Sequence, residues 1–133
     1  MKSLTHKVIL TLALLMLVGC GESGPPTGTV SGKVIIGGAA PKEPVRVQFI
    51  NSIIGQGASA TTTADGSYKL DRPVQVAEYT VYFEKLVDAS EQVSAKDELL
   101  LTVPRTYRNE ASSPMKKKVE KGANTIDLEV PSA

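Results

Sequence analysis

Hydrophobic and polar residues alternate with a period of two along much of the chain after residue 28. The alternation is clean in four segments, 29–36, 45–49, 79–83 and 125–130. Such alternation is typical of β-strands with one face on a core and one in water. The side chains expected to point inward are Val30, Gly32, Val34 and Ile36; Val45, Val47 and Phe49; Tyr79, Val81 and Phe83; and Ile126, Leu128 and Val130.

Turn signals separate these segments. Gly37-Gly38 with Pro41 ends the first segment, and Gly122-Ala123-Asn124 precedes the last. Asp65-Gly66 predicts a tight hairpin between residues 60–64 and 67–70, because glycine tolerates a positive φ. Short strands with turns every ~8–12 residues predict an all-β fold, an antiparallel immunoglobulin-like β-sandwich of about seven strands.

One stretch of the chain fits neither strand nor turn clearly. Residues 86–103 are compatible with a short helix over Ser90–Leu101 or with a loop that crosses between strands. Pro104 then predicts extended backbone leading into Arg105-Thr106-Tyr107.

The first 19 residues have the pattern of a signal peptide. Lys2, His6 and Lys7 form a positive start, and Val8–Val18 is apolar apart from Thr11. This apolar run of 11 residues is too short to span a bilayer core of about 30 Å as a helix. Its length is typical of the hydrophobic region of a signal peptide.

The apolar run ends in Leu17-Val18-Gly19-Cys20, which resembles the lipobox of bacterial lipoproteins. The small residues would let extended backbone enter the peptidase, and the thiol is the nucleophile that receives a diacylglyceryl group. The resemblance implies cleavage between Gly19 and Cys20 and lipid attachment at Cys20. Two or more acyl chains give stable anchoring, whereas one is marginal.

The expected division of the chain follows from this start. Residues 1–19 are a lipoprotein signal peptide, 20–27 a lipidated flexible tether, and 28–133 one β-sandwich domain. The expected location is the cell membrane or outer membrane, exported and lipid-anchored. Gly21, in the position where aspartate retains Gram-negative lipoproteins at the inner membrane, favours the outer membrane.

Three consecutive motifs resemble the start of carboxypeptidase regulatory-like domains: 28–34 (GTVSGKV), 44–49 (PVRVQF) and 63–68 (TADGSY). The later stretches 103–107, 113–115 and 121–128 are similar to small bacterial lipoproteins with this domain. The resemblance, over roughly residues 28–130, implies a transthyretin-like β-sandwich. The chain departs from the family pattern at Val76-Ala77-Glu78-Tyr79, where the family has a glycine shortly before the tyrosine.

Charge and cysteine content narrow the classes of partner. The 133 residues include 15 basic and 14 acidic side chains, and loss of Lys2 and Lys7 leaves 13 against 14. This balance gives no support for nucleic-acid binding. The basic run Lys116-Lys117-Lys118 predicts a strand edge or a solvated face. Cys20 is the only cysteine, so no disulfide forms within the chain.

The mature chain has few of the residue types that catalysis or cofactor binding commonly uses. The only histidine, His6, leaves with the signal peptide, which excludes Ser-His-Asp and ordinary zinc sites from the mature domain. The histidines and the Tyr-Arg-Gly-Ser-like end of transthyretin-like hydrolases are missing too. Paired carboxylates remain, at Asp97-Glu98 and at Asp127 with Glu129, and both pairs are expected to be solvated surface.

Candidate residues also exist for two further ligands, a calcium ion and a sugar. Asp65 is a weak candidate for calcium, because one acid in a glycine turn usually serves the turn itself. Tyr68, Tyr82 and Tyr107 are candidates for stacking on sugars, although tyrosine also packs on sheet faces. Of these three, Tyr107 lies in an irregular segment.

The resulting hypothesis is a non-catalytic, lipid-anchored envelope protein without a cofactor. Its β-sandwich would contact an envelope protein or a glycan, or give structural support. The alternatives are an accessory subunit of a membrane transport or secretion complex that docks through a sandwich edge, and a carboxylate-based hydrolase.

Overall fold

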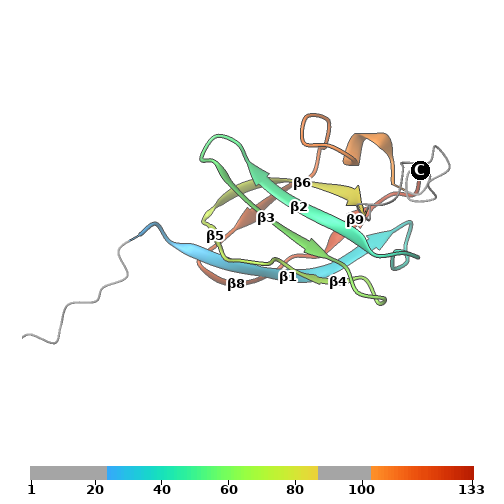
Figure 1. Cartoon of the computed structure of the whole chain (residues 1–133), viewed down its shortest axis with the longest axis horizontal. Helices are drawn as coiled ribbons and strands as arrows, with labels where there is room; N and C mark the ends of the chain where they lie inside the picture. The colour runs from blue at the N-terminus through green and yellow to red at the C-terminus, as the bar shows by residue number, and fades with distance from the viewer. Residues whose placement is uncertain (1–23, 87–102) are drawn as a thin grey trace, which may run out of the picture.

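The alternating segments form the strands of two β-sheets that pack face to face in the computed structural model (Figure 1), which describes residues 24–86 and 103–133. The first sheet contains β1 (Thr27–Ile36), β4 (Ser67–Lys69), β5 (Val74–Gln75), β8 (Gly122–Thr125) and β9 (Leu128–Val130). The second contains, in spatial order, β3 (Gln56–Thr61), β2 (Val45–Asn51), β6 (Ala77–Lys85) and β7 (Lys116–Val119). The all-β sandwich is confirmed, with nine strands in the described residues in place of about seven.

Strand β1 is the centre of the first sheet and has partners along both of its edges. On one edge β4 and β5 pair with it antiparallel, and on the other β8 and β9 pair with it parallel. The sandwich is thus mostly antiparallel, as predicted, and this edge of β1 is its parallel part. The chain passes from β7 to the end of the sandwich where β1 starts, so its last two strands run in the same direction as β1.

The second sheet is antiparallel throughout. β2 forms a hairpin with β3 and pairs on its other edge with β6, so that Val47 lies opposite Phe83 and Phe49 opposite Val81. β6 continues to β7, where Thr80 lies opposite Lys116. Lys116-Lys117-Lys118 thus occupies the edge strand of this sheet, as one of the two predictions for the run stated.

The core consists of the inward members of the alternating segments. Val30, Val45, Val47, Val81 and Leu128 are all at most 1% exposed. Phe49 lies at the centre, with its ring 6.2 Å from that of Tyr68 and 6.3 Å from that of Tyr79. Ile36 and Ile126, predicted inward, are partly buried and pack against this core. The period of two therefore located the core in all four segments.

The predicted last strand, 125–130, is interrupted at Ile126 and Asp127. β8 and β9 keep one register along β1, because Ser31 lies opposite Thr125 and Val34 opposite Leu128. Between them the Lys33 N–H donates to Asp127 Oδ1 at 3.0 Å, so a side chain takes the place of a main-chain acceptor. The regular ladder is lost there while the direction of the strand is kept.

The predicted hairpin at Asp65-Gly66 is wrong, although its turn is present. The Thr63 N–H donates to the Ser67 carbonyl at 2.8 Å, and Gly66 has a φ of +83°. The flanking strands β3 and β4 belong to different sheets. Thr62 Oγ1 accepts from the Val45 N–H, while the Val34 N–H donates to the Gly66 carbonyl, so the two sides of the turn bind different sheets.

Two strands begin earlier in the chain than the sequence predicted. Thr27 is the first residue of β1, and the Pro26 carbonyl accepts from the Val76 N–H at 3.0 Å, so the end of the predicted tether belongs to the fold. Gly122-Ala123-Asn124, predicted as a turn before the last strand, lies within β8 because it pairs with β1.

The segment between β6 and β7 is described only in part. The predicted helix or loop over Ser90–Leu101 lies outside the described residues. Pro104 has the expected extended backbone, with ψ at 145°, and leads into a 3₁₀ turn, η2 (Arg105–Tyr107). At Val76–Tyr79 the chain passes from β5 to β6 with no positive φ, so this crossing does not need the glycine of the family pattern.

Substituting Gly32 tests how closely β1 and its parallel neighbour approach each other. A Cβ at Gly32 would lie 2.0 Å from the Ile126 carbonyl oxygen, whereas one at Gly24 would meet nothing within 4 Å. We expect Gly32→Ala to lower the free energy of unfolding by about 1–3 kcal/mol through overpacking. Gly24→Ala should change it by less than about 0.5 kcal/mol. Urea unfolding followed by circular dichroism measures both, and equal stabilities would contradict the close approach.

Candidate functional site

The residues of the predicted lipid attachment lie before the described part of the chain. Gly19, Cys20 and the predicted cleavage between them therefore stay predictions from the sequence, as do the signal peptide and the carboxylate pair Asp97-Glu98. The described structure begins at Gly24, and the first main-chain hydrogen bond from this end is the one between Pro26 and Val76. It marks the point at which the predicted tether would meet the sandwich.

Asp65 serves the turn in which it lies. Its carboxylate accepts hydrogen bonds from the Thr63 hydroxyl at 2.5 Å and from the Ser67 N–H at 3.0 Å. These bonds, first of all the one from Thr63, lower the pKa of Asp65 from 3.8 to about 2. Among residues 24–86 and 103–133, no three histidine, cysteine, aspartate or glutamate side chains gather as metal ligands would. Turn chemistry thus accounts for Asp65 without a calcium ion.

The three candidate tyrosines have different surroundings. Tyr68 is 4% exposed, and its hydroxyl donates to the Ile126 carbonyl at 2.6 Å. Burial, and secondarily the charge of Asp127, raises the pKa of Tyr68 well above its ordinary value. The prediction that Tyr68 stacks on a sugar is therefore wrong, because its ring is part of the core. Tyr82 and Tyr107 are half-buried, and Tyr107 packs against the core from η2.

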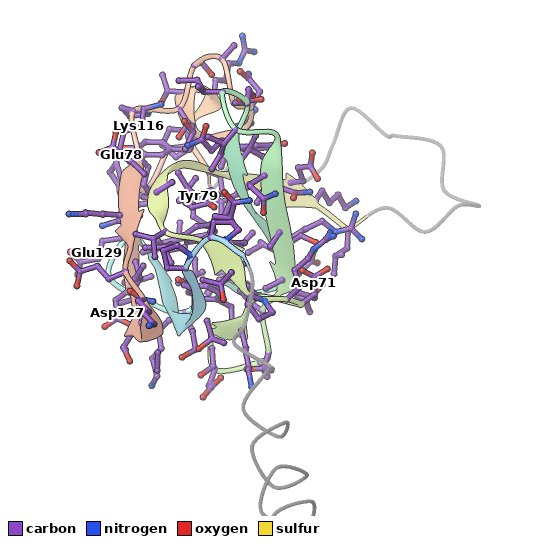
Figure 2. The ribbon with its side chains drawn as sticks, turned by 90° about the vertical axis from the view of Figure 1, so that its left-hand side faces the viewer. Asp71, Glu78, Tyr79, Lys116, Asp127 and Glu129 are labelled. Atoms are coloured by element: carbon purple, nitrogen blue, oxygen red, sulfur yellow. The ribbon has the colours of Figure 1, made fainter. Side chains whose placement is uncertain are left out.

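Glu129 lies on the outward face of β9 and Asp127 directly before that strand, and both are solvated as expected. Both are exposed, and Figure 2 shows them along one edge of the molecule, on the opposite side from Asp71. Asp127 has the structural role already described, since it accepts from the Lys33 N–H. Tyr79, by contrast, lies between the two sheets, and its hydroxyl donates to the Gln75 carbonyl at 2.8 Å.

The lysine edge, defined as Lys116, Lys117 and Lys118 of β7, is the most basic strand of the described fold. Lys116 donates to the Thr80 hydroxyl, and Lys118 Nζ lies 4.0 Å from Glu120 Oε1. Both partners of the latter pair are about 70% exposed, so the pair contributes little to stability.

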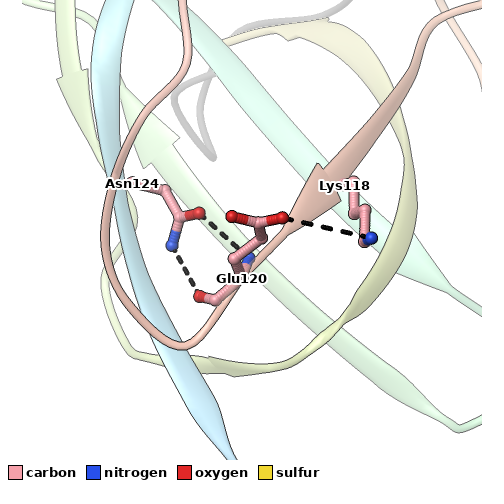
Figure 3. Close-up of polar contacts among 3 residues, drawn as sticks. All are labelled: Lys118, Glu120 and Asn124. Carbon is pink, nitrogen blue, oxygen red and sulfur yellow. Dashed lines mark hydrogen bonds and ion pairs between the residues drawn. The ribbon is translucent and has the colours of Figure 1, made fainter.

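The turn that follows the lysine edge is held by Asn124 (Figure 3). Its side chain accepts from the Glu120 N–H at 2.9 Å and donates to the Glu120 carbonyl at 2.8 Å. Asn124 thereby closes the turn between β7 and β8 and fixes where Lys121 projects from the sandwich.

The hydrophobic pattern gave no sign of the surface that stands out most in the structure. Ile53 is 96% exposed, Ile54 42% and Val76 36%. Ile53 and Ile54 form the turn between β2 and β3, and Val76 lies between β5 and β6. Two adjacent isoleucines between Asn51-Ser52 and Gly55 are the only signal in the sequence that could have identified this turn as an exposed apolar feature.

Comparison of the chain with protein-family models, with curated proteins and with solved structures found no match. Within residues 24–86 and 103–133, no helix is long and apolar enough to cross a membrane.

The carboxylate of Asp65 gives a testable pH dependence. Because its pKa is lower in the folded chain than the ordinary 3.8, its contribution to stability is complete above about pH 4 and is lost as the pH falls toward 2. Asp65→Asn keeps an acceptor oxygen but does not titrate. We expect wild-type protein to lose more stability than Asp65→Asn between pH 4 and pH 2, measured by urea midpoints. Equal losses in the two proteins would contradict this role.

The hydroxyl of Tyr68 is the second test. Tyr68→Phe removes the hydrogen bond to the Ile126 carbonyl without changing the volume of the ring, so we expect the free energy of unfolding to fall by about 1–2 kcal/mol. Tyr82→Phe is the matched control on the outward face of β6, where the change should stay within about 0.5 kcal/mol. If both variants unfold at the same urea concentration as the wild type, the hydroxyl of Tyr68 has no structural role.

Proposed function

We propose that this protein is a lipid-anchored component of the bacterial cell envelope whose β-sandwich is a non-catalytic module for contact or support. The observation that carries the proposal is Leu17-Val18-Gly19-Cys20 at the end of an 11-residue apolar run. Cys20 is also the only thiol of the chain, so lipidation uses a residue with no competing disulfide.

The way the fold starts supports the same proposal. Only five residues separate Cys20 from Pro26, whose carbonyl is already hydrogen-bonded to Val76. Thr27 then opens β1, which is the central strand of its sheet. An anchor at Cys20 would therefore attach, through a short linker, to the strand on which the first sheet is organised.

The described surface favours a binding or support role over catalysis. Three of the candidate polar side chains have structural partners: Asp65 closes a turn, Tyr68 bonds the Ile126 carbonyl, and Asp127 bonds the Lys33 N–H. A partner that adds a strand to β7 is disfavoured, because exposed lysines on an edge strand discourage such pairing. Contact through loops and turns is the mode that we propose for an envelope protein or a glycan.

Replacement of Cys20 tests the anchor. The wild-type protein from a bacterial host should fractionate with membranes, and its intact mass should show loss of residues 1–19 and gain of a diacylglyceryl group and a further acyl chain. Cys20→Ala should keep its first 19 residues and carry no lipid, while Ser23→Ala, three residues past the lipidation site, should match the wild type. A wild-type protein with an uncleaved start and no fatty acid would overturn the proposal.

A further inference from the structure

The large exposed apolar side chains among residues 24–86 and 103–133 lie at one end of the sandwich. Isolated exposed apolar residues are ordinary on protein surfaces. Here, however, the three large ones, Ile53, Ile54 and Val76, lie at the end where β1 begins. Figure 1 shows the turn between β2 and β3 and the start of β1 at the same end, and the C-terminus at the other.

A short series of hydrogen bonds connects the apolar turn to the start of the chain. The Val76 N–H donates to the Pro26 carbonyl, and two residues later the Glu78 carbonyl accepts from Asn51 Nδ2 at 2.9 Å. The other atom of that amide, Asn51 Oδ1, accepts from the N–H groups of Ile53 at 3.0 Å and Ile54 at 3.3 Å. Asn51 therefore holds the two isoleucines in a defined turn, adjacent to the strand that borders the tether.

Charged side chains lie at the same end of the sandwich as this apolar turn. The lysine edge pairs with the first four residues of β6, which places its cations at the same end, and Lys121 follows directly. Glu78, Glu110 and Glu120 are also there, and Glu110 accepts from the Ser52 hydroxyl. Apolar side chains with lysines at the same end match the boundary between acyl chains and anionic headgroups.

The length of the linker restricts what this end can face. The chain from Cys20 to Pro26 makes six Cα–Cα steps, which reach about 20 Å when fully extended. A lipid on Cys20 would therefore keep the start of β1 within that distance of the headgroups. The ten residues of β1 span about 33 Å, so the opposite end of the sandwich is farther from the anchor than the linker can reach.

We propose that the Ile53-Ile54 turn, with Val76 beside it, inserts into the interface of the bilayer that holds the anchor and so orients the sandwich with its C-terminal end away from the membrane. This inference rests on the proposed lipidation of Cys20. The lipid gives attachment, and the turn gives orientation.

A single fluorescent label tests the insertion. Because lipidation consumes the thiol of Cys20, Ile54→Cys supplies the only free thiol of the mature protein. The lipidated protein is labelled there with an environment-sensitive dye and reconstituted in vesicles of phosphatidylethanolamine and phosphatidylglycerol. Ala64→Cys is the matched control, since it lies beside Gly66, whose carbonyl binds Val34 at the far end of β1. Ile53→Asp combined with Ile54→Cys tests the neighbouring isoleucine.

We expect the label at residue 54 to shift to the blue and to be quenched by spin-labelled lipids several-fold more than the label at residue 64. Ile53→Asp should remove most of that difference. Equal quenching at the two positions, quenching that survives Ile53→Asp, or a blue shift without lipid quenching would each overturn the insertion. Mass spectrometry of the same samples reports lipidation separately, so equal quenching in a lipidated protein refutes the turn alone, whereas an unlipidated protein refutes the anchor and the insertion that rests on it.

Discussion

The first sheet depends on β1 being paired along both of its edges. β4, β5, β8 and β9 contain only two to four residues each, and each of them pairs with β1. Strands this short have little stability alone, because few hydrogen bonds offset the entropy lost on ordering them. Gly28 and Gly32 let this happen, since a Cβ at either would meet a main-chain carbonyl at about 2 Å. The central strand thus has no side chain at two positions, which lets the neighbouring parallel segment approach closely.

The sequence allowed most of the core to be predicted and little of the connectivity. β2 and β6 alternate cleanly, so their buried faces followed from local pattern alone. The turn at Asp65-Gly66 was also local, but the sheet to which each flanking strand belongs depends on Val45 and Val34, which are distant in sequence. The parallel pairing of β8 and β9 with β1 has no signature in either segment, because alternation carries no information about direction.

Among the candidate functional residues, too, local pattern was enough for some positions and not for others. Tyr68 could have been recognised as buried, since it shares the phase of Leu70, and both are at most 5% exposed. Hydropathy alone predicts that Ile53 and Ile54 are buried, and only the turn-forming residues around them indicated otherwise. The N–H groups of Ile53 and Ile54 both donate to Asn51 Oδ1, and these bonds close a turn in which neither side chain reaches the core.

The two ends of the sandwich differ in chemistry, and β1 links them. At its start lie the proposed tether, the apolar turn and the lysine edge; at its finish lie the Gly37-Gly38 turn and the hydrogen-bonded Asp65 turn. An upright orientation on a membrane would direct these polar turns outward, where an envelope protein or a glycan could reach them. If the apolar turn were instead a contact for a protein partner, the proposed lipidation of Cys20 would force that partner to share the space next to the bilayer, within reach of a five-residue linker. The short linker therefore favours lipid as the occupant of this end and leaves the far turns as the surface for contact.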